Sequence, residues 1–214
     1  MTLAHRLRPA AAEPEGALVL LHGRGADEHD LEPLLDALDP DRRLAGVLPR
    51  GPLSLPPGGA HWYVVPRVGF PDPPPFGQSV QELAALLDSL PAALGIAYDR
   101  IAIGGFSQGA VMSHALGLGP RRARPAGVLA LSGFVPTVEG WEIDVTDRAS
   151  LPVFIAHGTH DPIIGVEFGR AARDRCLAAG LDVDYRETPV PHTIDPGIIP
   201  AARAWLARAV PTPG

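Results

Sequence analysis

A serine between two glycines is the clearest sign of chemistry in this chain. The segment Gly105-Phe106-Ser107-Gln108-Gly109 follows the apolar run Arg100–Ile103 and precedes a helical pattern. A chain that turns so sharply from strand into helix brings the residues two before and two after the serine into contact, so both must lack a side chain. The hydroxyl then projects from the strand end beside the free N–H groups of a helix start. This placement predicts that Ser107 is a nucleophile.

A serine nucleophile needs a base, and the base needs an acid that orients it. In an open α/β sheet the two are expected at the ends of later strands, in the order Ser, then Asp or Glu, then His. Asp161 follows the apolar run Leu151–Ala156, and His192 follows the run Asp182–Glu187. We therefore predict that Ser107, Asp161 and His192 form a catalytic triad.

Other residues compete for the roles of base and acid. His160 is the rival base, but it adjoins Asp161 in sequence, where the two side chains diverge, and only His192 lies downstream of that acid. The rival acids are Asp184, Glu187 and Asp195, of which the last is the strongest because it lies three residues past His192. Five further histidines are assigned no chemistry: His5 and His29 on the surface, His114 within a helix, and His22 and His157 as holders of loop backbone.

Acyl transfer also requires two N–H groups that hold the developing oxyanion. The main-chain N–H of Gln108, the residue after the nucleophile, is the first. The glycine-rich loop His22–Asp27 can bend its backbone toward a ligand, so we predict that the main-chain N–H of Arg24 is the second. The Arg24 guanidinium has two interpretations: an anchor for a carboxylate or phosphate, or a surface group beside Asp27 or Glu28.

The elements that must position these residues alternate between strand and helix. Continuous apolar runs are typical of strands buried on both faces of a parallel sheet. The predicted strands are Ala17–Leu21, Leu44–Leu48, Arg100–Ile103, Gly127–Leu131, Leu151–Ala156 and, as a half-exposed strand, Asp182–Glu187. The predicted helices are Asp30–Leu38, Ser79–Leu90, Ser107–Leu118, Val166–Ala179 and Pro200–Ala209. Ser79 and Glu82 form a capping box that would start the second helix. The alternation implies right-handed crossovers and helices on both faces of the sheet.

One long segment, Pro49 to Phe76, interrupts this alternation. It contains nine prolines and shows no helical pattern. Structureless loops of this length are uncommon and are usually functional or disordered. We predict that this proline-rich loop lies near the active site and that Trp62, Tyr63 and Phe70 contact the substrate. The alternative is a surface excursion whose aromatic side chains fill gaps.

Composition narrows the chemistry further. The 214 residues fit one domain, residues 1–214, and all 18 basic residues are arginine, which excludes lysine-based chemistry such as Schiff bases. The single Cys176 excludes a disulfide framework and a cysteine-based metal site. A net charge of -6 gives no basic footprint for nucleic acid, and no apolar run approaches the roughly 18 residues of a membrane span. We therefore expect a cytoplasmic protein.

Together these residues resemble the carboxylesterase/phospholipase family of small α/β-hydrolases, which includes the acyl-protein thioesterases. The match runs in register through Leu20–Asp27, Gly104–Gly109, His157–Pro162 and His192. The resemblance implies an α/β-hydrolase fold with a mostly parallel central sheet, helices on both faces and no large cap domain. It also implies an enzyme that acts on small-molecule carboxylic esters without a cofactor or metal. Members of this family often form dimers, so the resemblance allows a homodimer. The chain departs from the family pattern at Arg24, where a large apolar residue is common, and at Pro191, where glycine usually precedes the histidine.

The resulting hypothesis is a serine carboxylesterase that hydrolyses short- to medium-chain carboxylic esters through an acyl-enzyme. An acyl thioesterase or lysophospholipase of the same fold is the alternative, and it would need a long apolar groove beside the serine. A non-catalytic binding protein would carry a broken triad, which the sequence does not show. A metal-dependent hydrolase that uses His157, His160 and Asp161 is the third alternative.

Overall fold

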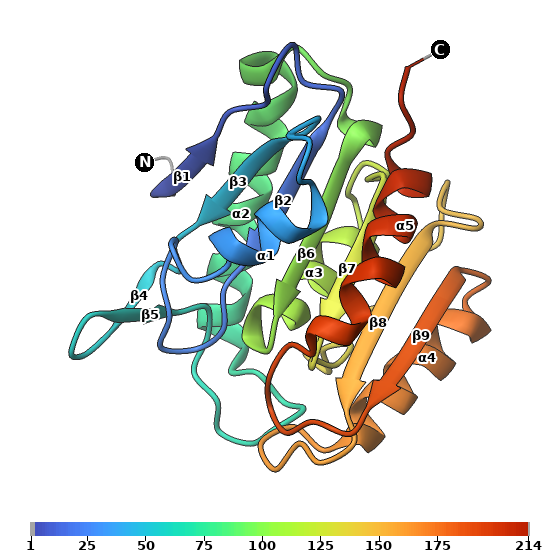
Figure 1. Cartoon of the computed structure of the whole chain (residues 1–214). Helices are drawn as coiled ribbons and strands as arrows, with labels where there is room; N and C mark the ends of the chain where they lie inside the picture. Colours follow the sequence, from blue (N-terminus) through green and yellow to red (C-terminus); the bar gives the residue numbers. More distant parts are fainter. Residues whose placement is uncertain (1–2, 214) are drawn as a thin grey trace.

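The computed structural model describes residues 3–213 and is built around a seven-stranded sheet (Figure 1). Its strand order is β1-β3-β2-β6-β7-β8-β9. In this sheet all neighbours pair parallel except β1, an edge strand that pairs antiparallel with β3. The strands are β1 His5–Arg8, β2 Ala17–Leu21, β3 Ala45–Pro49, β6 Ile101–Phe106, β7 Gly127–Leu131, β8 Pro152–Gly158 and β9 Asp182–Thr188. The mostly parallel sheet is the one that the sequence predicts.

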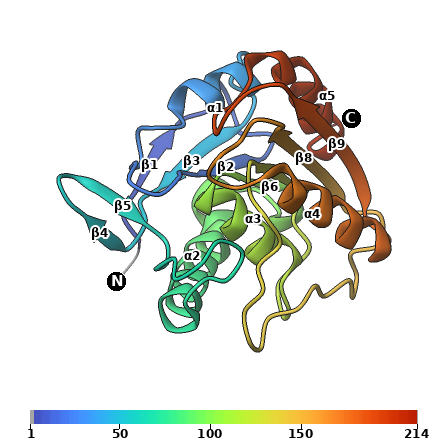
Figure 2. The same cartoon turned by 90° about the horizontal axis from the view of Figure 1, so that it is seen from below.

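Helices cover both faces of the sheet, as Figure 2 shows. One face carries α1 (Glu32–Leu38) and α5 (Ile199–Ala209), and the other carries α2 (Pro73–Leu94), α3 (Gln108–Leu118) and α4 (Val166–Ala178). Two short 3₁₀ helices are η1 (Tyr98–Arg100) and η2 (Pro196–Ile198). Within residues 3–213 no large cap domain covers the carboxyl ends of the strands, and no helix is both long and apolar enough to span a membrane.

The central strands are apolar along their whole length because both of their faces are covered. All residues of β2, β3 and β7 are buried. In β7, Val128 and Ala130 pack on the side of α3 and α4, whereas Leu129 and Leu131 pack on the side of α1 and α5. This arrangement explains why the sequence shows continuous apolar runs rather than alternation. The predicted ranges of the first and fourth strands match β2 and β7 residue for residue.

The sequence pattern does not indicate three of the strands. β1 carries three exposed residues out of four, so it presents no apolar run. β4 (Leu53–Leu55) and β5 (Gly59–His61) pair antiparallel as a separate hairpin inside the proline-rich segment. The expectation of a structureless loop from Pro49 to Phe76 is therefore wrong. The segment holds the end of β3, this hairpin and the first residues of α2.

The predicted start of the second helix at Ser79 is also wrong. α2 begins at Pro73, and three consecutive prolines, Pro73–Pro75, occupy its first turn. Proline is tolerated there because the first N–H groups of a helix have no partner within the helix. The Ser79 hydroxyl instead donates to the main-chain oxygen of Trp62 at 2.5 Å. It therefore ties α2 to the chain that follows β5 rather than capping a helix.

α3 is buried along its whole length, beneath the sheet and beside α2. It carries His114, whose two ring nitrogens have no hydrogen-bond partner among residues 3–213. Burial, assisted by the charge of Arg175, lowers the pKa of His114 to about 3. His114 is therefore a neutral core residue, and protonation of its ring would destabilise the folded state.

This burial predicts a specific acid sensitivity. The pKa of His114 is lower in the folded chain than in the unfolded chain, so below about pH 6.5 the unfolded chain binds a proton that the folded chain does not. The free energy of unfolding therefore falls by about 1.4 kcal/mol for each pH unit between about 6.5 and 3, and His114 has no such effect above pH 6.5. When the pH is lowered from 7.5 to about 5, the free energy of unfolding of the wild type should fall by about 2 kcal/mol more than that of His114→Leu. Urea denaturation at the two pH values measures this difference. The control is His5→Leu, at an exposed position; an equal acid response of His114→Leu and the wild type would contradict the prediction.

Candidate active site

Ser107 lies at the sharp turn between β6 and α3, at the carboxyl edge of the sheet. Its φ of 55° and ψ of -119° form a backbone conformation that residues other than glycine rarely adopt. A Cβ atom on Gly109 would lie 1.8 Å from the Leu21 main-chain oxygen, and one on Gly105 would lie 2.5 Å from the main chain of Gly109. Both glycines are therefore required by the close packing of this turn against the end of β2.

His192 lies beside this serine, in the loop between β9 and η2. Its Nε2 is 2.9 Å from the Ser107 Oγ, and its Nδ1 is 2.6 Å from the Asp161 Oδ2. An ionised carboxylate only accepts hydrogen bonds, so Nδ1 carries the hydrogen and Nε2 is left to accept from the serine hydroxyl. The ring of Phe106 packs against the imidazole, with centroids 4.8 Å apart. The three residues that the sequence groups as a triad thus form one hydrogen-bonded chain.

Asp161 is held by more than His192. Its Oδ1 accepts the main-chain N–H groups of Ile163 and Ile164 at 2.8 and 2.9 Å, and its Oδ2 accepts from His192. Burial alone would raise the pKa of Asp161, but the hydrogen bonds from His192, Ile164 and Ile163 outweigh burial and lower it. The carboxylate is therefore charged and fixed in orientation, which in turn fixes the imidazole.

The rival acids are engaged elsewhere. Asp195 accepts the Gly197 N–H at the start of η2. The remaining rivals make ion pairs on β9: Asp184 with Arg186, and Glu187 with Arg170, both at 2.8 Å. The structure therefore places Asp161, rather than any of these carboxylates, against the imidazole of His192.

Two buried histidines hold loop backbone, as the sequence indicates. The His22 Nε2 accepts the Gly51 N–H at 2.9 Å, and its Nδ1 lies 2.7 Å from the Gly23 oxygen. The His157 Nε2 lies 2.8 Å from the Ile164 oxygen. Burial lowers the pKa of His22 despite the hydrogen bond to Gly23. Neither ring faces Ser107 through a hydrogen bond in residues 3–213.

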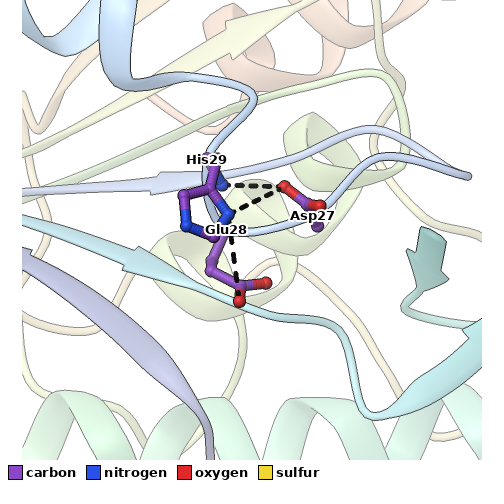
Figure 3. Close-up of side chains that lie close together, drawn as sticks. All are labelled: Asp27, Glu28 and His29. Atoms are coloured by element: carbon purple, nitrogen blue, oxygen red, sulfur yellow. Dashed lines mark hydrogen bonds and ion pairs between the residues drawn. The ribbon is translucent and has the colours of Figure 1, made fainter. Parts of the chain in front are cut away.

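Of the proposed metal ligands, His157 and Asp161 lie together, with Nε2 3.6 Å from Oδ2, but His160 does not complete a ligand cluster with them among the described residues. The one cluster of potential ligand side chains in residues 3–213 is Asp27, Glu28 and His29 (Figure 3). There, His29 interacts with Asp27 at 3.3 Å. The Arg50 guanidinium is 2.8 Å from Glu28 and 3.8 Å from Asp27. The cluster is thus an ion-pair network with its own cation.

The two residues expected to bind the oxyanion both lie at the cavity of Ser107. Gln108 is the first residue of α3, and Arg24 lies on the loop after β2; both line the same cavity as Ser107. That loop is pinned on one side of Arg24, because the Gly25 N–H donates to Ala60 at 2.8 Å and the Ala60 N–H donates to Ala26 at 2.8 Å. The hairpin of β4 and β5 therefore fixes the backbone beside Arg24.

The side chain of Gln108 has a role that the sequence does not indicate. Its Oε1 accepts the Trp62 N–H at 3.0 Å, and its Nε2 donates to the Tyr63 oxygen at 2.9 Å. These two bonds clamp the chain after β5 to the start of α3. The segment that walls the site is thus attached to the residue next to the nucleophile.

Ser107 opens into a cavity of about 440 Å³, within the range of small-molecule sites. Its lining is mostly apolar and comprises Arg24, His61, Tyr63, Val64, Val65, Val68, Ser107, Gln108, Phe134, Ile163 and Ile164. The valines, Phe134 and the two isoleucines were not predicted from the sequence. Phe134 lies just beyond the end of β7, and the isoleucines lie just after Asp161. Their positions after strand ends could have indicated that they line the site.

Of the three aromatic residues expected to contact substrate, Tyr63 lines this cavity. Trp62 does not: it is fully buried, and its Nε1 donates to the His22 oxygen at 2.8 Å. Phe70 is exposed, packs under the guanidinium of Arg67 and lines a second cavity of about 250 Å³. The substrate-contact prediction is therefore wrong for Trp62, whose buried ring is a support beneath the wall.

The family of the chain follows from comparison with known proteins. The model of the phospholipase/carboxylesterase family matches residues 5–209. The chain belongs to this family. An acyl-protein thioesterase 1 of Yarrowia lipolytica is 30% identical over 179 residues, which cover 78% of each chain. The assignment confirms an enzyme of the serine hydrolase class, as the sequence predicts.

Solved structures agree with this assignment. A carboxylesterase from Mesorhizobium loti superposes with a TM-score of 0.82 at 26% identity and covers 95% of this chain and 93% of its own. The Bacillus cereus carboxylesterase has a TM-score of 0.84 at 24% identity, covers 97% of this chain and 94% of its own, and shows the fold alone. The predicted α/β-hydrolase fold is confirmed.

The packing of the turn at Ser107 predicts the effect of one added methyl group. Gly109→Ala should lower the free energy of unfolding by about 1–3 kcal/mol or more, because its Cβ would overlap the Leu21 oxygen. The matched control is Gly77→Ala in α2, where a Cβ meets nothing within 4 Å. That control should gain about 0.5–1 kcal/mol from helix propensity. Chemical denaturation of both variants measures the difference; equal effects would refute this account of the turn.

Proposed function

We propose that the protein is a serine carboxylesterase that hydrolyses short- to medium-chain carboxylic esters through an acyl-enzyme. The observation that carries the proposal is the continuous hydrogen-bonded chain from Ser107 through His192 to Asp161, at the wall of an apolar cavity. Ser107 is proposed as the nucleophile, His192 as the general base and acid, and Asp161 as the group that orients the imidazole.

The reaction proceeds in two halves. His192 Nε2 takes the proton of Ser107 as Oγ attacks the ester carbonyl, and the negative charge that develops on the oxygen is held by the main-chain N–H groups of Arg24 and Gln108. The imidazolium then protonates the leaving alcohol, which leaves an acyl group on Ser107. In the second half, His192 takes a proton from water as the water oxygen attacks the acyl carbonyl. The imidazolium then returns the proton to the Ser107 Oγ as the carboxylic acid is released. The negative charge of Asp161 stabilises the imidazolium in both halves.

The size of the cavity supports short to medium acyl chains. Phe134 lines both the active-site cavity of about 440 Å³ and the neighbouring cavity of about 250 Å³, so its ring is a shared wall between them. The ring is buried and packs against Phe168 at 5.6 Å between centroids. The relative from Yarrowia lipolytica is named an acyl-protein thioesterase. A thioesterase for long acyl chains would need a longer apolar space than the first cavity alone.

Several attributes of the protein stay predictions from the sequence. We propose one domain for residues 1–214, action on small-molecule esters rather than nucleic acid, and no requirement for a cofactor or metal. A cytoplasmic location is proposed from the use of cysteine, since Cys176 is single, free and buried. A homodimer is allowed by the family, whose members often dimerise.

Removal of the triad residues tests the mechanism. Ser107→Ala should reduce kcat for p-nitrophenyl butyrate at least about 10³-fold, and Asp161→Asn by a comparable order, because the amide would hold the wrong imidazole tautomer. The matched controls are Ser89→Ala and Asp195→Asn, whose side chains bond the Leu86 oxygen and the Gly197 N–H rather than His192. Full activity of Ser107→Ala would refute the proposal, and a larger loss in Asp195→Asn than in Asp161→Asn would reassign the acid.

The shared wall predicts a change of chain-length preference. Phe134→Ala joins the two cavities, so each methylene newly accommodated should raise kcat/KM about three- to fourfold for esters longer than the wild-type optimum. Rates on p-nitrophenyl esters from C2 to C12 give the profile. Phe70→Ala is the control, because Phe70 lines only the second cavity of the two. A wild-type maximum at the longest chains would favour the thioesterase or lysophospholipase alternative.

A further inference from the structure

The lining of the active-site cavity carries a positive charge without a negative one to balance it. Among its lining residues Arg24 is the one with a permanent charge, and no acidic side chain lines the cavity with it. Valines, isoleucines and Phe134 form most of the remaining wall. Arg24 is exposed, so its guanidinium is accessible to a charged group of a ligand that enters this cavity.

The acidic residues closest in sequence to Arg24 are committed to other cations. Glu28 binds Arg50 at 2.8 Å, and Asp27 interacts with His29 at 3.3 Å and with Arg50 at 3.8 Å. Figure 3 shows Asp27 and Glu28 turned toward His29. The Asp27 carboxylate also accepts the main-chain N–H of His29, which lowers the pKa of Asp27. Its negative charge is thus already stabilised by groups other than Arg24. Among residues 3–213 this leaves the exposed Arg24 without a carboxylate partner, so it forms no ion pair with Asp27 or Glu28.

The backbone around Arg24 is held in place rather than loose. Gly25 adopts a φ of 89°, and the hydrogen bonds of Gly25 and Ala26 with Ala60 secure the loop to β5. The Cα atom of Arg24 is therefore fixed beside the cavity that the residue lines. The planar fork of donors of a guanidinium matches a carboxylate in a bidentate arrangement.

We propose that Arg24 selects esters whose acyl group ends in a carboxylate, that is, monoesters of short dicarboxylic acids. This inference rests on the proposed function. The leaving alcohol must face His192, which protonates it, so the acyl group is placed in the cavity that Arg24 lines. The ester oxygen is held by the main-chain N–H of Arg24, so a carboxylate bound by the same residue's guanidinium lies only a few bonds from the ester carbonyl. One guanidinium balances one carboxylate charge, whereas a phosphate dianion would be left with excess charge.

Binding to the Ser107→Ala protein tests this selection without turnover. Monoethyl succinate is titrated calorimetrically into Ser107→Ala and into the same protein with Arg24→Gln. A charge-assisted pair predicts that Arg24→Gln raises Kd about 10- to 100-fold. The matched control adds Arg67→Gln, an exposed arginine that stacks on Phe70 and is not part of the cavity lining; it should leave Kd within about twofold. An unchanged Kd in the Arg24 variant, no binding to Ser107→Ala, or tighter binding of methyl phosphate than of monoethyl succinate would each overturn the proposal.

Turnover by the wild type separates this inference from the proposed function. Ethanol release is compared for monoethyl succinate and for ethyl 4-methylpentanoate, a neutral ester of the same shape. The inference predicts a higher kcat/KM for the charged ester and a loss of that preference in Arg24→Gln but not in Arg67→Gln. If the neutral ester is hydrolysed and Arg24→Gln changes neither binding nor preference, the inference is wrong and the proposed esterase activity is retained. Arg24-dependent binding without hydrolysis of either ester would support the inference and contradict the proposed function.

Discussion

The close contact between the turn at Ser107 and the end of β2 is the constraint on which the rest of the site depends. Gly109 packs so tightly against the Leu21 main chain that no side chain fits between them. β2 and β6 are parallel neighbours, with Leu21 opposite Gly105, so this contact also brings the loop after β2 alongside the serine. One packing requirement therefore sets the strained backbone of Ser107 and the position of Arg24 at the same cavity.

Hydrogen bonds to main-chain groups extend this rigidity outward. Asp161 is fixed by two N–H groups of its own turn, which leaves one carboxylate oxygen aimed at His192. The Gln108 side chain clamps the segment after β5, and this segment supplies much of the cavity wall. A site built in this way needs little reorganisation when negative charge develops on the substrate, which is the condition for electrostatic stabilisation of a transition state.

Much of this arrangement could be predicted from the sequence because it depends on local patterns. The glycines around Ser107 report a steric requirement, and the buried strands appear as apolar runs because both sheet faces are covered. Features that depend on tertiary contacts escaped prediction. β1 has no apolar run because three of its four residues are exposed, and the capping pattern at Ser79 misled because its hydroxyl bonds Trp62 instead. Trp62 and the cavity wall could not be separated by residue type alone, since an aromatic side chain is equally suited to support a wall or to form one.

Activation of Ser107 by His192 is the central step of the proposed mechanism, and a covalent label tests it most directly. Wild type and His192→Ala are treated with a fluorophosphonate probe, and the labelled residue is located by peptide mass spectrometry. We predict one adduct on Ser107 in the wild type and labelling slowed at least about 10³-fold in His192→Ala, since the hydroxyl is then a weak nucleophile. Failure of the wild type to label, or equal labelling of Ser107 in both proteins, would contradict the account.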